Sequence, residues 1–200
     1  MAGTRLVLLL LLGNPRLRIS GVSQLTLKAT SLHLHRVSVA GLIIRKPLRP
    51  VADPVRWIAV PSEVDDLLEG KRLVDTGFPE TLADQVIGRF IAGHLIRVSR
   101  KSKSNVDLEQ LEGLDEIWAL CFRKPKPGWR VFGRFLEKDL FVGLRAHDRH
   151  EFGSRFSFSG KASGILSDWE ELFGTIPPLR SDKLSDYLGG VYVDVDEPQD

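Results

Sequence analysis

The strongest constraint in this 200-residue chain is the spacing of three strand-like segments near its middle. Aromatic and aliphatic residues are concentrated in Glu116 to Arg123, Trp129 to Leu136 and Leu140 to His147. The connectors between them, residues 124–128 and 137–139, are too short to contain a crossover helix. Strands joined by such short connectors are antiparallel neighbours. The sequence therefore predicts a three-stranded antiparallel meander.

A strand and two helices are predicted before this meander. Val55 to Val60 is typical of a strand ended by Pro61, and Ser62 is a suitable N-cap for a short helix that stops at Gly70. From Glu80 to about Arg97, apolar residues recur every four positions, as in a helix that packs against a core. We therefore expect an α+β fold with the order strand, two helices and three-stranded antiparallel meander.

Changes in composition divide the chain into three predicted segments. Residues 1–52 are expected to be a disordered segment or a wrongly assigned leader, because the first 50 residues contain eight lysines and arginines and no acidic residue. A targeting segment and a nucleic-acid-binding arm are alternative interpretations of this stretch. Residues 53–150 form the predicted domain. Residues 151–200 form a small C-terminal extension with short helices and an acidic tail, in which Val191 to Val195 is a candidate strand.

Several classes of site and location are disfavoured by the sequence. The single cysteine, Cys121, excludes an internal disulfide and a cysteine-based zinc site. His147 and His150 have metal-ligand spacing but no third ligand beside them. The apolar run Leu6 to Leu12 is too short to span a bilayer. We expect no metal, no cofactor and no membrane partner, and a cytoplasmic location.

The alternation of side chains along strands predicts a basic face on the meander. On the middle strand this face holds Arg130, Phe132 and Arg134. On the last strand the shared face is predicted to hold Phe141, Gly143, Arg145 and His147. Arginines, a histidine and a phenylalanine on one surface can bind phosphates and stack a base. The alternative is the solvated face of a half-buried sheet.

The turn between the last two strands decides whether this cluster forms. If the turn contains only residues 138–139, Arg130 lies opposite His147. The same register places Phe132 opposite Arg145. A three-residue loop without a bulge would instead disperse the cluster.

A second basic stretch follows the long predicted helix. Arg97, Arg100, Lys101 and Lys103 are separated by serines and by Val98. Cations are favoured after the C-terminus of a helix, so a solvated loop is one interpretation. A loop that contacts phosphate is the other.

Three segments of the predicted domain together resemble a known family. These are Leu111 to Leu120, Gly128 to Phe135 with its Gly-Trp-Arg-Val-Phe motif, and Gly143 to His147. They are similar to the second half of the RelE/ParE toxin superfamily of type II toxin–antitoxin systems, and most similar to its HigB-like branch. The resemblance covers roughly Val55 to Arg149. It implies a small domain that cleaves mRNA on the ribosome, as RelE and HigB toxins do, or inhibits gyrase, as ParE toxins do.

The resemblance also implies a set of functional residues and partners. The expected catalytic residues of a metal-independent endoribonuclease, or mRNA interferase, are Arg130, Arg145 and His147. The expected nucleic-acid-binding residues are Arg123, Lys124, Lys126, Phe132, Arg134 and Arg149. The expected partners are a cognate antitoxin protein and RNA or the ribosome. Arginine and histidine can supply the base, the acid and the phosphate-stabilising cation of such a reaction without metal. A non-catalytic relative with the same fold and a phage or mobile-element structural protein are the alternative functions.

Overall fold

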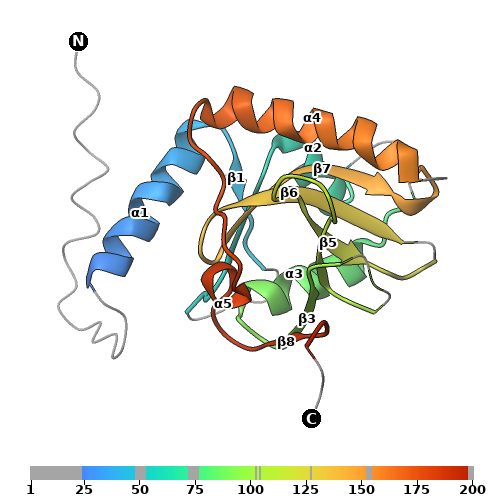
Figure 1. The fold of residues 1–200 in the computed structure, drawn as a ribbon, viewed down its shortest axis with the longest axis horizontal. Coiled ribbons are helices and arrows are strands. Elements are labelled where there is room, and N and C mark those ends of the chain that lie inside the picture. Colours follow the sequence, from blue (N-terminus) through green and yellow to red (C-terminus); the bar gives the residue numbers. More distant parts are fainter. Residues whose placement is uncertain are drawn as a thin grey trace.

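The computed structural model describes residues 24–47, 53–71, 77–101, 103, 105–126, 128–151 and 155–197. The strands are β1 (Ile43–Ile44), β2 (Trp57–Val60), β3 (Ile96–Ser99), β4 (Leu108–Gln110), β5 (Trp118–Phe122), β6 (Trp129–Glu137), β7 (Leu140–Asp148) and β8 (Tyr192–Asp194). The helices are α1 (Gln24–Val39), α2 (Ser62–Leu68), α3 (Glu80–Ile91), the 3₁₀ helix η1 (Arg149–Glu151), α4 (Arg155–Phe173) and α5 (Leu184–Tyr187). Within these residues the strands form one eight-stranded sheet in the order β1-β2-β7-β6-β5-β4-β3-β8 (Figure 1).

The prediction that the sheet is a three-stranded meander is wrong, because further strands extend it on both sides into a mixed sheet. The strands β5, β6 and β7 are antiparallel neighbours. Beyond them, β2 pairs in parallel with β7, and β3 pairs in parallel with both β4 and β8. The strands β1, β4 and β8 have only two or three residues. Such segments are too short to show an alternating pattern, and backbone groups of any sequence can pair in this way.

The long predicted helix ends earlier than its apolar pattern suggests. α3 stops at Ile91, and residues 96–99 form β3 instead of a last helical turn. Gly93 has a φ of +70°, and its N–H donates to the Phe90 carbonyl. A glycine in the left-handed region is a common way to end a helix, because other residues adopt it at a cost.

The predicted register between the last two strands of the meander is confirmed. Arg130 lies opposite His147, and Phe132 lies opposite Arg145. The pairing of β6 with β7 shifts by one residue at two places between these pairs and the turn. The two shifts have opposite directions, so the predicted pairs are restored.

The predicted side-chain faces of β7 are wrong, because the strand contains a bulge. Leu144 is skipped in the pairing between Gly143 and Arg145. A bulge adds one residue to one strand, so the alternation of faces changes beyond it. Phe141 and Gly143 pack on the side of α2 and α3. Arg145 and His147 lie on the opposite side, which α4 covers.

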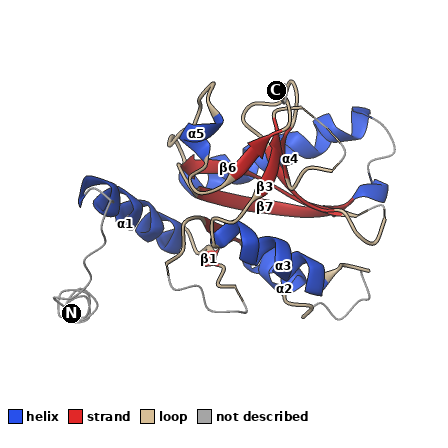
Figure 2. Ribbon diagram, turned by 90° about the horizontal axis from the view of Figure 1, so that it is seen from below, coloured by secondary structure: helices blue, strands red, loops and turns tan. Residues whose placement is uncertain are grey.

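Helices cover both faces of the sheet and create two cores. α2 and α3 lie on one side, and α4 lies on the other (Figure 2). The first core includes Ile87, Phe90, Trp118, Phe135 and Tyr187. The second core includes Val37, Ala119, Phe132, Val142, Ile165 and Trp169. The β6 part of the predicted basic face, which holds Arg130, Phe132 and Arg134, is therefore buried.

Segments from outside the predicted domain take part in this fold. Arg45 lies in the expected leader, yet its guanidinium donates a 2.6 Å hydrogen bond to Asp65 of α2, with both side chains buried. In the expected C-terminal extension, α4 covers one face of the sheet. The strand predicted at Val191 to Val195 is confirmed by β8, which pairs with β3. The sheet thus crosses both predicted boundaries, at residues 52 and 150, while residues 1–23 lie outside the described residues.

None of the helices in the described ranges combines the length and the apolar character that crossing a membrane requires.

Candidate nucleic-acid interface

Arg130, the expected central catalytic residue, is buried in an ion pair. Its side chain is 5% exposed, and its Nε donates a 2.6 Å hydrogen bond to Oε1 of Glu109, which is 1% exposed. Burial lowers the pKa of Arg130, but Cys121 and Glu109 outweigh that effect, so its pKa is raised. A guanidinium held by a buried carboxylate is poorly placed to bind a phosphate from solvent. The expectation that Arg130 lies on an open face is wrong.

The two neighbouring residues of the predicted basic face are also buried. Phe132 is 1% exposed and belongs to the second core, so it offers no stacking surface to a base. The Arg134 guanidinium donates to the carboxylate of Asp115 at 2.9 Å and lies 5.4 Å from the centre of the Trp169 ring. Burial lowers the pKa of Arg134, but its charge remains paired. Phe132 and Arg134 are structural residues of this core.

Arg145 is held by α4. Its Nε and Nη2 donate to the two carboxylate oxygens of Asp168 at 2.6 and 2.7 Å, and this fork raises the pKa of Arg145. A Cβ atom at Gly164 would lie 2.5 Å from Arg145 Nη1, so the helix passes directly over the guanidinium. The arginine side chain is still 41% exposed. Its charge is therefore neutralised locally but remains accessible.

His147 lies at the end of β7, where the sheet meets η1. Its Nδ1 is 3.1 Å from a carboxylate oxygen of Glu151, and its ring centre is 6.0 Å from that of Phe132. The backbone places His147 opposite Arg130, but the guanidinium of Arg130 is directed to Glu109. The structure thus brings the backbones of the three expected catalytic residues together, but each side chain faces a different carboxylate.

The remaining predicted residues meet at the edge where β5 ends and β6 begins. Lys124, Lys126 and Arg149 are exposed. The Arg149 N–H donates to the Gly128 carbonyl at 2.9 Å, which ties η1 to the β5–β6 loop.

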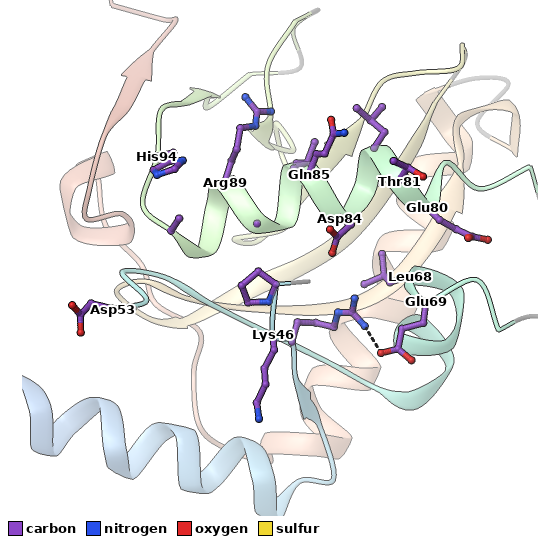
Figure 3. A pocket seen from close by; sticks show the side chains of 16 residues that line it. Lys46, Asp53, Leu68, Glu69, Glu80, Thr81, Asp84, Gln85, Arg89 and His94 are labelled. Carbon is purple, nitrogen blue, oxygen red and sulfur yellow. Dashed lines mark hydrogen bonds and ion pairs between the residues drawn. The ribbon is translucent and has the colours of Figure 1, made fainter. Parts of the chain in front are cut away.

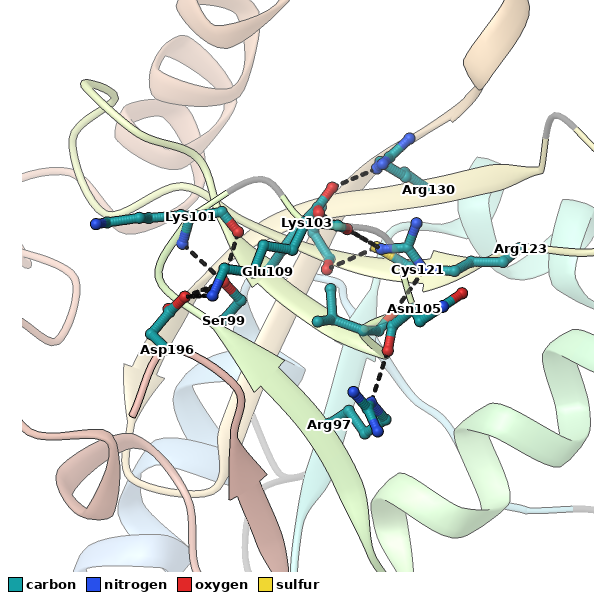
Figure 4. A network of polar contacts seen from close by, with 12 residues as sticks. Arg97, Ser99, Lys101, Lys103, Asn105, Glu109, Cys121, Arg123, Arg130 and Asp196 are labelled. Carbon is teal, nitrogen blue, oxygen red and sulfur yellow. Dashed lines mark hydrogen bonds and ion pairs between the residues drawn. The ribbon is translucent and has the colours of Figure 1, made fainter. Parts of the chain in front are cut away.

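Arg123 is the bridge between the β5–β6 loop and the β3–β4 loop. Its Nε donates to the Val106 carbonyl at 2.6 Å, and its Nη2 donates to the Lys103 carbonyl at 2.9 Å (Figure 4). Lys101 and Lys103 on that second loop are exposed. Two loops and η1, each of which carries cations, are therefore linked by hydrogen bonds. We name this surface the basic rim; it consists of Lys101, Lys103, Arg123, Lys124, Lys126 and Arg149.

The sequence pattern predicts only part of the basic rim. The interpretation of residues 97–103 as a phosphate-contacting loop pointed to Lys101 and Lys103, but nothing local linked that loop to Arg123. The partners Glu109, Asp115 and Asp168 were missed. Each lies at least 19 residues from the arginine it binds, so no short motif reveals the pair.

A cavity of about 1350 Å³ is separate from the basic rim. It lies between α3, the end of α2 and the segment after β1 (Figure 3). Its described lining mixes cations such as Lys46 and Arg89 with the acids Glu69, Glu80 and Asp84. None of the predicted catalytic or nucleic-acid-binding residues is in that lining.

The described residues contain no group of three or more histidine, cysteine, aspartate or glutamate side chains arranged to hold a metal ion. The side chain of His150 lies outside the described residues, so the His147 and His150 pair is not placed.

Comparisons with protein-family models, with curated proteins and with solved structures give no match to this chain.

Proposed function

We propose that the protein is a nucleic-acid-binding relative of the RelE/ParE toxins, and that its basic rim contacts the phosphates of RNA. The observation that carries this proposal is that two cation-bearing loops and η1 lie together where β5 and β7 end. The loops are connected by the hydrogen bonds of Arg123 and by that of the Arg149 N–H. Their lysine side chains are exposed, as phosphate contacts require.

The chemistry of the rim favours contacts with the backbone of RNA over contacts with its bases. The predicted stacking residue, Phe132, is buried, and the six rim residues include no aromatic side chain. Lysine and arginine bind phosphates without reading sequence, and such binding weakens steeply with salt. We therefore expect binding with little sequence preference.

The test is to measure single-stranded RNA binding by fluorescence anisotropy across a range of salt concentrations. The double variant Lys124→Ala/Lys126→Ala should weaken binding. If both lysines contact phosphate, the slope of log affinity against log salt should become shallower by about 1.4. Lys138→Ala is the matched control, because Lys138 is an exposed lysine in the turn at the other end of β6 and β7. An equal loss in the control, or no salt dependence in the wild type, would refute the proposal.

Metal-independent cleavage of ribosome-associated mRNA is a second candidate function, favoured by the position of His147. This imidazole lies two residues before Arg149 and next to Glu151, and a histidine beside a carboxylate has the chemistry of a general base for a 2′-hydroxyl. Its Nε2 is buried, so the ring would have to move to reach a substrate. Arg145 is accessible enough to stabilise a phosphorane. The pairing of Arg130 with Glu109 counts against this candidate, since it leaves the central expected cation neutralised.

Induction of the protein in cells, with growth and mRNA fragments as readouts, separates the two candidates. If cleavage occurs, His147→Ala should reduce it by about a hundredfold or more. His35→Ala, on the exposed surface of α1, should leave it unchanged. If cells that express the wild type grow normally and contain no mRNA fragments, the cleavage candidate is refuted and the binding role remains.

The cellular setting that we propose is that of a toxin with a cognate antitoxin in the cytoplasm. The unpaired, buried Cys121 fits a reducing compartment. Co-purification with the product of a neighbouring reading frame is the direct test of the antitoxin. A gyrase inhibitor would act without RNA binding, so the anisotropy experiment also separates that alternative.

A further inference from the structure

The carboxylate of Asp196, just after β8, occupies a pocket of hydrogen-bond donors on the β3–β4 loop. The Arg100 backbone N–H donates to its Oδ2 at 2.6 Å. The Ser99 hydroxyl lies 2.9 Å from the same oxygen and 2.6 Å from the Lys101 carbonyl, so its one proton can be donated to either acceptor. The Lys103 ammonium lies 2.5 Å from its Oδ1 (Figure 4). Donors from three residues thus converge on one anion.

This donor set has the composition of a site for a tetrahedral oxyanion. It combines a backbone N–H, a hydroxyl and an ammonium, which are the groups that proteins use to bind phosphate. The hydroxyl belongs to Ser99, whose side chain is fully buried, and a second bond to it from the Lys101 N–H, at 3.0 Å, orients it. Two of the loop cations, Lys101 and Lys103, also belong to the basic rim. The site is therefore continuous with the surface proposed to bind RNA.

The backbone of the C-terminal segment brings Asp196 to the loop. β8 pairs in parallel with β3, and the Val195 N–H then donates to the Val98 carbonyl at 2.9 Å. Asp196 follows at once, and Lys103 also donates to the Val195 carbonyl at 2.9 Å. Burial raises the pKa of Asp196, but Lys103, Arg100 and Ser99 outweigh it and leave the pKa lowered. The group in the site is therefore an anion at neutral pH.

We propose that Ser99, Arg100 and Lys103 form a phosphate-binding site, and that Asp196 occupies this site as a built-in competitor. When phosphate binds, the Asp196 carboxylate must leave the three donors. That an RNA backbone phosphate is the natural ligand rests on the function proposed above; the presence of the anion site does not.

The first experiment uses inorganic phosphate and the full-length chain. Thermal unfolding is measured in phosphate and in chloride at equal ionic strength for the wild type, Asp196→Ala and Glu197→Ala. Glu197 is the matched control, because it is the next acidic residue of the same tail, is exposed and lies outside the donor set. Phosphate should raise the melting temperature of Asp196→Ala more than that of the other two. Equal responses in all three proteins would overturn the site.

Asp196→Asn keeps the experiment decisive if the alanine variant does not fold. Asparagine retains an oxygen that can accept from Ser99 and Arg100 but loses the charge that Lys103 requires. Its melting temperature should therefore also respond to phosphate more than that of Glu197→Ala does, and the Arg100 amide resonance should shift on titration. No shift of that resonance at saturating phosphate would overturn the site.

The second experiment repeats the comparison with single-stranded RNA. Removal of the Asp196 charge should tighten RNA binding by roughly tenfold, the size of one charge-assisted contact, while Glu197→Ala should change it little. An equal gain in both variants would show that the tail acts through its general charge, which overturns the competitor role. A phosphate response without any RNA binding would support the anion site and overturn RNA as its ligand.

Discussion

Arg130 of β6 reaches across β5 to donate a hydrogen bond to Glu109 of β4, and both side chains are almost fully buried. The pair links three strands in the middle of the sheet. Between them, Cys121 of β5 lies opposite Arg130 in the register. A position for which the family resemblance implies a catalytic role is thus part of the interior.

We predict that Arg130→Ala destabilises the fold by about 3–5 kcal/mol, because it leaves the Glu109 carboxylate buried without its partner. Glu109→Ala should have a similar effect through the unpaired guanidinium. The free energy of unfolding in urea measures both. Arg149→Ala, an exposed arginine at the end of the same sheet, is the control and should stay within about 0.5 kcal/mol. A stable Arg130→Ala protein would mean that the pair does not support the fold.

Residues 24–47 should contribute to stability through Arg45. Arg45→Met removes the partner of buried Asp65 and should lower the free energy of unfolding by about 3 kcal/mol. Lys46→Met changes the neighbouring, exposed cation in the same way and should have little effect. Equal stability of the two variants in a urea titration would instead favour a dispensable leader.

Two glycines should respond in opposite ways to alanine. At Gly133, beside the β7 bulge, a Cβ atom would lie 1.9 Å from the Val142 carbonyl oxygen, a backbone atom that cannot move away cheaply. We expect Gly133→Ala to destabilise by about 3 kcal/mol or more. At Gly88 in α3, the nearest atom would be 3.8 Å away, so Gly88→Ala should stabilise by up to about 1 kcal/mol. Thermal unfolding of both variants checks the sign of each change.

Cys121 should be unreactive in the folded protein. Its side chain is buried, and burial, followed by the nearby Glu109 charge, raises the pKa of its thiol to about 12. A thiol-specific reagent at pH 8 should label it only as fast as the protein unfolds, because the thiolate is the nucleophile. Rapid labelling without denaturant would contradict this.

The same shift predicts a pH dependence of stability. An unfolded chain releases the Cys121 proton near the ordinary value of 9.0, whereas the folded chain holds it up to about pH 12. The folded state then binds more protons than the unfolded state, so stability falls as pH rises between these values. Cys121→Ser should show a smaller fall in urea titrations over this range.

The sequence by itself determined the parts of this protein that local patterns control. The strands β5, β6 and β7 follow from their apolar runs and short connectors, and the two-residue turn after Glu137 predicts the pairing of Arg130 with His147. The first turns of α3 follow from a repeat of apolar residues along one helix face. Each of these features depends on residues that are close together in the chain.

Only the tertiary structure decided which surfaces are buried and which charges are free. The bulge at Leu144 changes the side-chain faces of β7, and bulges leave no reliable trace in an alternating pattern. The short strands β4 and β8 bring Glu109 to Arg130 and Asp196 to Lys103 from 21 and 93 residues away. Because such pairs form between segments that meet only when the sheet assembles, their chemistry cannot be read from neighbouring residues.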